Sequence, residues 1–192
     1  MLKKKIEDIC NRQVEREGYS SNLYLAMASW AETNGLSGVA AWMYSQSDEE
    51  RIHMLKFIKY INERDGKAVM PAFKKPAAEF KDVEDVFNEV LKHEEFVTAS
   101  INEIVALTLD EKDFNTHNFL QWFVKTDLQK FGHIKKLTDG IDRNNSSLLA
   151  SRRKNSIVWS KRSGVRRYGF GATCASTGFQ YDDWLTFGNL TT

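Results

Sequence analysis

The chain has 192 residues, of which 42% are hydrophobic and 12% aromatic, and this composition predicts a globular protein with a real core rather than a disordered chain. Its net charge of +1 conceals two unlike parts, because residues 1–145 carry 24 acids and 20 Lys or Arg while residues 146–192 carry 2 acids and 7 Lys or Arg. We therefore expect one domain over 1–145 and a separate basic extension over 146–192.

Compartment and membrane signals point to a soluble cytoplasmic protein. The two cysteines, Cys10 and Cys174, are far apart and form neither a metal-binding spacing nor a disulfide framework, which favours a reducing compartment. The basic start of the chain is not followed by the apolar segment of a secretion signal, and no run approaches the length of a membrane span.

The first two predicted helices span residues 5–34 and 39–65. Asn34-Gly35 ends the first, because glycine readily adopts the left-handed conformation found at helix C-termini, and Ser37 can cap the second. The short turn between the two helices predicts an antiparallel hairpin.

The third and fourth predicted helices span residues 83–110 and 114–143. Asp82 and Asp113 can cap their N-termini. The connection over 66–82 holds both prolines of the chain and reads as a long crossover. The predicted fold class is therefore all-α, a four-helix bundle with a long crossover between its second and third helices.

Each predicted helix has an apolar stripe at three- and four-residue spacing, and an acid interrupts each stripe near its middle. These acids, with one histidine, are Glu17, Glu50, His53, Glu94 and Asp127. At a rise of about 1.5 Å per residue, their distances from the short turns differ by only about one helical turn within each hairpin. The five side chains are therefore expected at one level of the bundle.

Several buried carboxylates at one level would repel each other, and a divalent cation removes that cost. An imidazole on the same face suits iron or zinc, and an inward Glu-x-x-His is a di-metal ligand pattern in bundles. The alternative is that these acids pair with Lys or Arg, or face solvent. Tyr24 is either a core residue or a hydrogen-bond and electron donor to the site, while His93, His117 and His133 read as surface or packing residues.

Four segments resemble the bacterial non-haem ferritins over about residues 1–143. They are Glu-Gly-Tyr-Ser-Ser-Asn-Leu-Tyr-Leu-Ala-Met (17–27), Asp-Glu-Glu-Arg-Ile-His-Met (48–54), Lys-His-Glu (92–94) and Asn-Phe-Leu-Gln-Trp-Phe-Val (118–124). The resemblance implies a 24-subunit homo-oligomeric shell that stores ferric mineral, with a di-iron ferroxidase centre in each subunit. It also implies that Glu17, Glu50 and His53 hold the first iron, that Glu50 bridges to a second iron beside Glu94, and that Tyr24 is the nearby catalytic tyrosine. Haem is not expected, and Met54 reads as a packing residue.

The fourth helix departs from the family pattern. Asp127 stands where the family has glutamine and is expected to bind the second iron directly or through water. The family also has an accessory third-iron site. Three of its acids are replaced here, by Thr126, Gln129 and Lys130, and Glu49 is the one acid of that site that remains. Lys130 is three residues after Asp127, so its ammonium is expected near the third position. We expect the third site to be lost and the second to be weakened. Gly18 also replaces a usual apolar residue.

The extension over 146–192 does not match the family. Residues 147–160 could form a short helix, and the segment beyond 163 is expected to be loosely ordered or to reflect an out-of-frame reading. A basic, aromatic segment could also bind nucleic acid, although we do not expect a nucleic-acid or membrane partner. Leu185-Thr186-Phe187-Gly188-Asn189-Leu190 resembles the loading peptide of encapsulin cargo proteins, which suggests an encapsulin-type shell as a further partner.

The predicted function is iron storage and detoxification by ferroxidase chemistry, with ferrous iron and dioxygen or peroxide as reactants. One alternative is a non-catalytic structural subunit, which the altered segment from Asp127 to Lys130 favours. A second alternative is a ferritin-like protein that binds DNA, for which the basic extension is the only support.

Overall fold

The computed structural model describes residues 2–143, 158–161 and 164–167. The chain divides into two compact units, Met1–Ala150 and Ser151–Thr192, and each is described by itself. The boundary expected after residue 145 stays a prediction.

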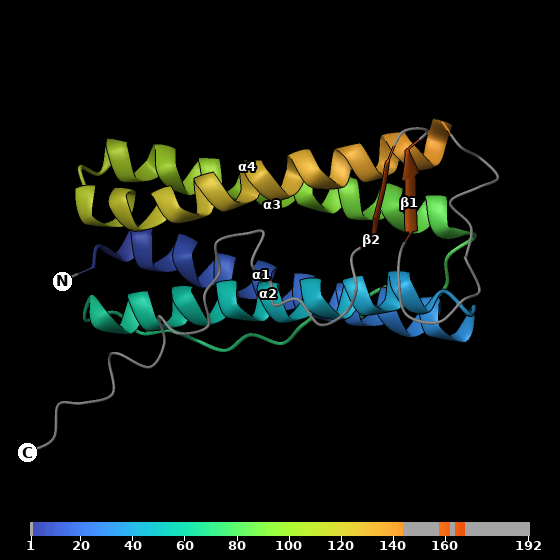
Figure 1. Cartoon of the computed structure of the whole chain (residues 1–192). Coiled ribbons are helices and arrows are strands. Elements are labelled where there is room, and N and C mark those ends of the chain that lie inside the picture. The colour runs from blue at the N-terminus through green and yellow to red at the C-terminus, as the bar shows by residue number, and fades with distance from the viewer. Residues whose placement is uncertain (1, 144–157, 162–163, 168–192) are drawn as a thin grey trace, which may run out of the picture. The chain divides into compact units, whose positions relative to one another are not determined.

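Four long helices form the first unit: α1 (Lys4–Thr33), α2 (Ser37–Glu63), α3 (Val83–Asp110) and α4 (Phe114–Arg143). They run side by side as two antiparallel pairs, α1 with α2 and α3 with α4, and a long connection joins the pairs (Figure 1). The predicted all-α bundle with a long crossover is therefore confirmed, and the predicted bounds differ by no more than two residues at any end.

The helix ends use the predicted residues with one exception. Gly35 has φ +74°, which makes it the left-handed residue after α1. Asp82 accepts a hydrogen bond from the Asp85 N–H and caps α3. The prediction that Ser37 caps α2 was wrong, because Leu36 occupies that position without a side-chain bond and Ser37 is already helical.

The core consists of two apolar clusters separated by a polar layer. This layer contains the buried side chains of Glu17, Glu50, His53, Glu94 and Asp127. One cluster includes Met27, Met43, Val90 and Ile134, and the other includes Val14, Phe57, Ile101 and Phe123. In every helix the predicted acid lies between a residue of one cluster and a residue of the other. The apolar clusters thus fix the level at which the acids meet, and they shield that level from water.

The connection between α2 and α3 explains the unusual glycine of α1. A Cβ atom at Gly18 would lie 2.4 Å from two ring carbons of Phe73 and 3.0 Å from the Met54 sulfur. Glycine is thus needed here because the connection passes directly over the helix, one residue beyond Glu17.

In the second unit, β1 (Val158–Lys161) and β2 (Gly164–Arg167) form an antiparallel pair, with Val158 opposite Arg167 and Lys161 opposite Gly164. The short helix expected over 147–160 is therefore wrong for its last three residues, and 147–157 lie outside the described residues. The segment resembling a loading peptide, 185–190, also lies outside them. Among the residues that the structure describes, no helix is long and apolar enough to cross a membrane.

Asp113, the cap of α4, is the basis of a stability prediction. Its carboxylate accepts bonds from the backbone N–H and the hydroxyl of Thr116, and it pairs with Arg64 at 3.3 Å. Burial alone would raise the pKa of Asp113, but these contacts hold it below the usual value. Asp113→Ala should lower the free energy of unfolding by about 2–3 kcal/mol at pH 7, through loss of a cap and of charge-assisted bonds.

The pH dependence follows from the sign of that shift. A depressed carboxyl pKa stabilises the fold above the unfolded value and ceases to do so as pH falls through the folded value. The difference between wild type and variant in urea unfolding should therefore shrink below about pH 4. Asp82→Ala is the control, because that cap is 49% exposed and should cost only about 1 kcal/mol. Equal losses in both variants would contradict the role given to Arg64.

Candidate metal centre

Three buried side chains at the polar layer bring metal-ligand atoms together. Glu17 comes from α1, and Glu50 and His53 come from one face of α2. Their ligand atoms lie within 4.8 Å of one another. His53 Nδ1 is 3.7 Å from Glu17 Oε2 and 3.7 Å from Glu50 Oε2, and none of the three residues is more than 1% exposed.

The oxygens that face the histidine have no hydrogen-bond partner in the part of the chain that the structure describes. Among the described residues, the buried atoms without a hydrogen-bond partner include Glu17 Oε2, Glu50 Oε2, His53 Nε2 and Asp127 Oδ2. The other oxygen of Glu17 accepts a bond of 2.7 Å from Gln13, which Ser100 holds in turn. Unpartnered buried carboxylate oxygens are costly, and a divalent cation would satisfy them. The donor set of two carboxylates and an imidazole fits iron.

The acids around His53 favour its protonated form. Burial would lower its pKa, but the neighbouring Glu50 and Glu17 raise the pKa of His53 to about 9. Binding of a cation through Nδ1 must therefore displace a proton, which makes metal affinity dependent on pH.

Asp127 is brought to the same layer but is not one of the three clustered ligands. It is 4% exposed, and burial together with the charge of Glu17 raises the pKa of Asp127 to about 7. Its unpartnered oxygen leaves it available to a cation. Direct ligation by Asp127 stays a prediction.

Lys130 lies elsewhere than expected. Its ammonium contacts Glu50 Oε1 and lies 2.8 Å from Glu94 Oε1, so it occupies the space between the two acids expected to bind the second iron, rather than the accessory position. The side chain is only 7% exposed. Although burial lowers its pKa, Glu50 and Glu94 raise the pKa of Lys130 well above the usual value, which keeps it charged.

Tyr24 completes the Lys130 side of the layer. Its hydroxyl donates to Glu94 Oε1, the same oxygen that Lys130 contacts, and its ring centre is 5.1 Å from the ammonium. Burial raises the pKa of Tyr24 well above the usual value, so it stays a neutral donor. Tyr24 is thus both a core residue and a hydrogen-bond donor to a site carboxylate.

Two aromatic side chains of α4 were not predicted at the site. Trp122 and Phe123 lie edge-on to the His53 ring, with centroids 5.3 and 5.6 Å away. They cover the imidazole and help to hold its orientation. Their position in the sequence could have predicted them, because Phe123 lies one helical turn before Asp127 and therefore on the same inward face of α4.

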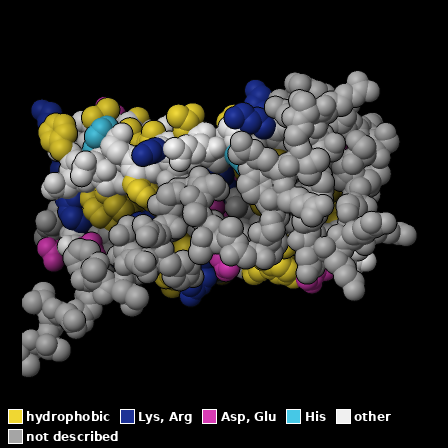
Figure 2. Space-filling model, viewed as in Figure 1, with side chains coloured by type: hydrophobic (Ala, Val, Ile, Leu, Met, Phe, Trp, Pro, Cys, Tyr) yellow, Lys and Arg dark blue, Asp and Glu magenta, His cyan; other side chains and the backbone are white. Residues whose placement is uncertain are grey.

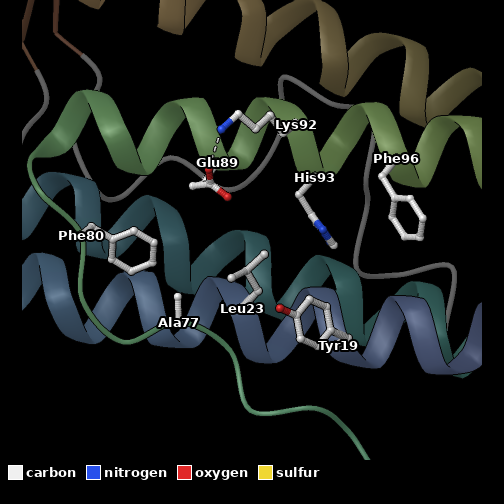
Figure 3. Close-up of a pocket in the computed structure, with 8 residues that line it drawn as sticks. All are labelled: Tyr19, Leu23, Ala77, Phe80, Glu89, Lys92, His93 and Phe96. Carbon is white, nitrogen blue, oxygen red and sulfur yellow. Dashed lines mark hydrogen bonds and ion pairs between the residues drawn. The ribbon is translucent and has the colours of Figure 1, made fainter.

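A hollow of about 260 Å³ lies on the outside of the bundle, between α1, α3 and the connection over 64–82 (Figure 3). Its lining includes Tyr19, His93 and Phe96 but none of the clustered ligands. His93 points from α3 towards α1, and one of its ring nitrogens is 2.7 Å from the Ser20 hydroxyl. This histidine is therefore used in packing, and the hollow is not the metal centre.

A buried carboxylate–imidazole cluster at the middle of a four-helix crossover bundle is the arrangement on which metal-binding bundle proteins are built. A family model described as "Ferritin-like domain" matches residues 7–143, and the chain belongs to this family.

Individual relatives agree with this assignment. The chain is 36% identical over 166 residues to a bacterial non-heme ferritin of Campylobacter jejuni, covering 84% of this chain and 99% of that protein. It is 40% identical over 125 residues to a probable bacterial non-heme ferritin-like protein of Haemophilus influenzae, covering 65% of this chain and 76% of that protein.

Solved structures are similar over the same region. An open pore ferritin of Archaeoglobus fulgidus superposes with a TM-score of 0.75 at 33% identity, covering 77% of this chain and 91% of that one. Chlorobium tepidum ferritin superposes with a TM-score of 0.74 at 35% identity, covering 77% and 90%.

Proposed function

We propose that this chain stores and detoxifies iron by oxidising ferrous ions at the centre built from Glu17, Glu50 and His53. The observation that carries this proposal is the set of buried, unpartnered ligand atoms on these three residues. Membership of the ferritin-like family supports iron as the metal.

The proposed reaction is the oxidation of ferrous iron by dioxygen. In the overall stoichiometry, two ferrous ions and one dioxygen, with two protons taken up, give two ferric ions and one hydrogen peroxide. Each ferrous ion supplies one of the two electrons, so a centre that holds one ion supplies half of them. The carboxylates supply negative charge that favours the ferric product over the ferrous substrate. His53 loses its proton when a cation binds, and Trp122 and Phe123 limit the access of water to the imidazole. Tyr24 orients Glu94 and lies where it could donate an electron.

Storage requires a shell, and the proposal includes a homo-oligomer of 24 subunits in the cytoplasm. The bundle exposes large apolar side chains, among them Phe114 and Leu128, which are 67% and 71% exposed. Figure 2 shows apolar side chains at the surface of one face, interspersed with charged ones. Assembly into a shell would give such side chains a place of burial between subunits, which the single subunit does not provide.

The test is anaerobic ferrous titration followed by stopped-flow mixing with dioxygen, on wild type and His53→Ala. Wild type should bind ferrous iron tightly and show a fast rise in ferric absorbance. The variant should lose at least 100-fold in affinity, because a missing ligand leaves two carboxylates without the imidazole. His117→Ala is the control, since that histidine lies outside the cluster. Identical traces for wild type and His53→Ala would contradict the proposal.

A structural subunit without rapid oxidation is the second candidate. The contact of Lys130 with Glu50 and Glu94 favours it, because this ammonium occupies ligands that a two-iron centre needs. Normal shell assembly and slow, His53-independent mineralisation would support this candidate over the first.

A further inference from the structure

We propose that the Lys130 ammonium takes the place of a second metal ion, so that each subunit binds a single divalent cation at Glu17, Glu50 and His53. This inference rests on the proposed metal binding at that cluster. It concerns how many ions the centre accepts, and it can fail while the cluster still binds iron.

The two oxygens of Glu50 show how the layer is divided. Oε2 faces His53 Nδ1 at 3.7 Å and has no hydrogen-bond partner, whereas Oε1 is in contact with Lys130. The two oxygens of Glu50 therefore face two different positions. Oε2 keeps an unused acceptor beside the histidine, whereas the ammonium of Lys130, a cation that belongs to the chain, contacts Oε1.

The buried atoms without a hydrogen-bond partner agree with this division. Among the described residues, the buried carboxylate and imidazole atoms of this kind belong to Glu17, Glu50, His53 and Asp127. Glu94 is also buried, at 3% exposure, but it is not among them. Its Oε1 lies 2.8 Å from the Lys130 ammonium and accepts a hydrogen bond from the Tyr24 hydroxyl. The Glu94 oxygen on the Lys130 side is thus already satisfied, whereas the clustered oxygens of Glu17 and Glu50 are not.

Charge and space oppose a second ion beside Glu94. A dication bound by both Glu50 and Glu94 would have to lie where the ammonium lies, and the two would repel strongly in a buried setting. The Lys130 side chain would have to leave the interior, exposing Glu94 and the face of Tyr24 as it did so. With one dication and one ammonium, three positive charges meet the four acids of the layer.

The test counts ions with zinc, which does not react with dioxygen. Isothermal titration of wild type should give one tight zinc ion per subunit, which His53→Ala should remove. Lys130→Met, which keeps most of the side-chain volume and removes the charge, should bind two. Lys130→Gln should also bind two, and it retains an N–H for Glu94 if the methionine variant fails to fold. Lys125→Met is the control, because Lys125 is exposed on the same helix and should leave the count at one.

The outcomes separate the two proposals. Two His53-dependent ions in wild type, or one ion in both Lys130 variants, would overturn this inference and leave iron binding at the cluster intact. No tight ion in wild type would overturn the proposed function, and this inference with it.

Discussion

Adding a divalent cation to the metal-free protein should raise its free energy of unfolding by about 3–4 kcal/mol at a free concentration between 100 and 1,000 times the dissociation constant. The reason is that the folded chain presents a formed ligand set at Glu17, Glu50 and His53, whereas the unfolded chain does not. The measurement is thermal or urea unfolding with zinc, and then again after removal of zinc by EDTA.

Glu17→Ala provides the matched comparison for this stabilisation. It removes one ligand and leaves the contacts of Lys130 with Glu50 and Glu94 in place, so the variant should gain less than about 1 kcal/mol from the same zinc concentration. An equal gain in wild type and Glu17→Ala would mean that zinc stabilises the bundle from some other place, such as the exposed acids.

The sequence predicted the bundle because its helices are long and strongly periodic. The stripes of α3 and α4 are bounded by Asp82 and Asp113, and both helix spans agree with the structure. The start of α2 was less well predicted. The Leu36 N–H bonds to the Ala31 carbonyl in the tight end of α1, and α2 then begins at once, so Ser37 has no free position at which to cap it.

The clustered ligands were predictable for a related reason. Glu17, Glu50 and His53 interrupt apolar stripes, and a short turn sets the relative height of α1 and α2. The position of these three ligands could therefore be predicted without the path of the long connection. Trp122 and Phe123 lie near Asp127 on α4, but no pattern in the sequence predicted that they would pack against His53.

Lys130 and Gly18 show where sequence reasoning fell short. Lys130 was expected at the accessory third position, but its long side chain can reach several acids, and in the structure its ammonium contacts Glu50 and Glu94. From the sequence alone, Gly18 is only a residue of low helix propensity in α1. The structure shows that Phe73 packs against it, and this contact could not be predicted because the connection that holds Phe73 has no periodic pattern.

Asp127→Asn should make the metal-free protein more stable at pH 8 by about 2–4 kcal/mol, while weakening its affinity for zinc. Asp127 is almost fully buried with an unpartnered oxygen, and burial raises its pKa to about 7. A raised carboxyl pKa means that the folded state holds the proton more tightly than the unfolded state does. Stability is therefore lost as pH rises from about 4 to about 7, and the loss then stays constant. The asparagine has no charge to bury, so it avoids this cost.

Urea unfolding of both proteins in EDTA, from pH 4 to pH 8, tests the sign as well as the size of this effect. The two should be nearly equal at pH 4 and should diverge until about pH 7. Asp48→Asn is the control, because Asp48 is exposed on α2 and should show no such divergence. With zinc present the order should reverse if Asp127 also contacts the cation, since the amide is a weaker ligand than the carboxylate. A metal-free Asp127→Asn that is less stable than wild type at pH 8 would instead show that the ionised carboxylate is favourably paired in the folded protein, with His53 or Lys130 as the partner.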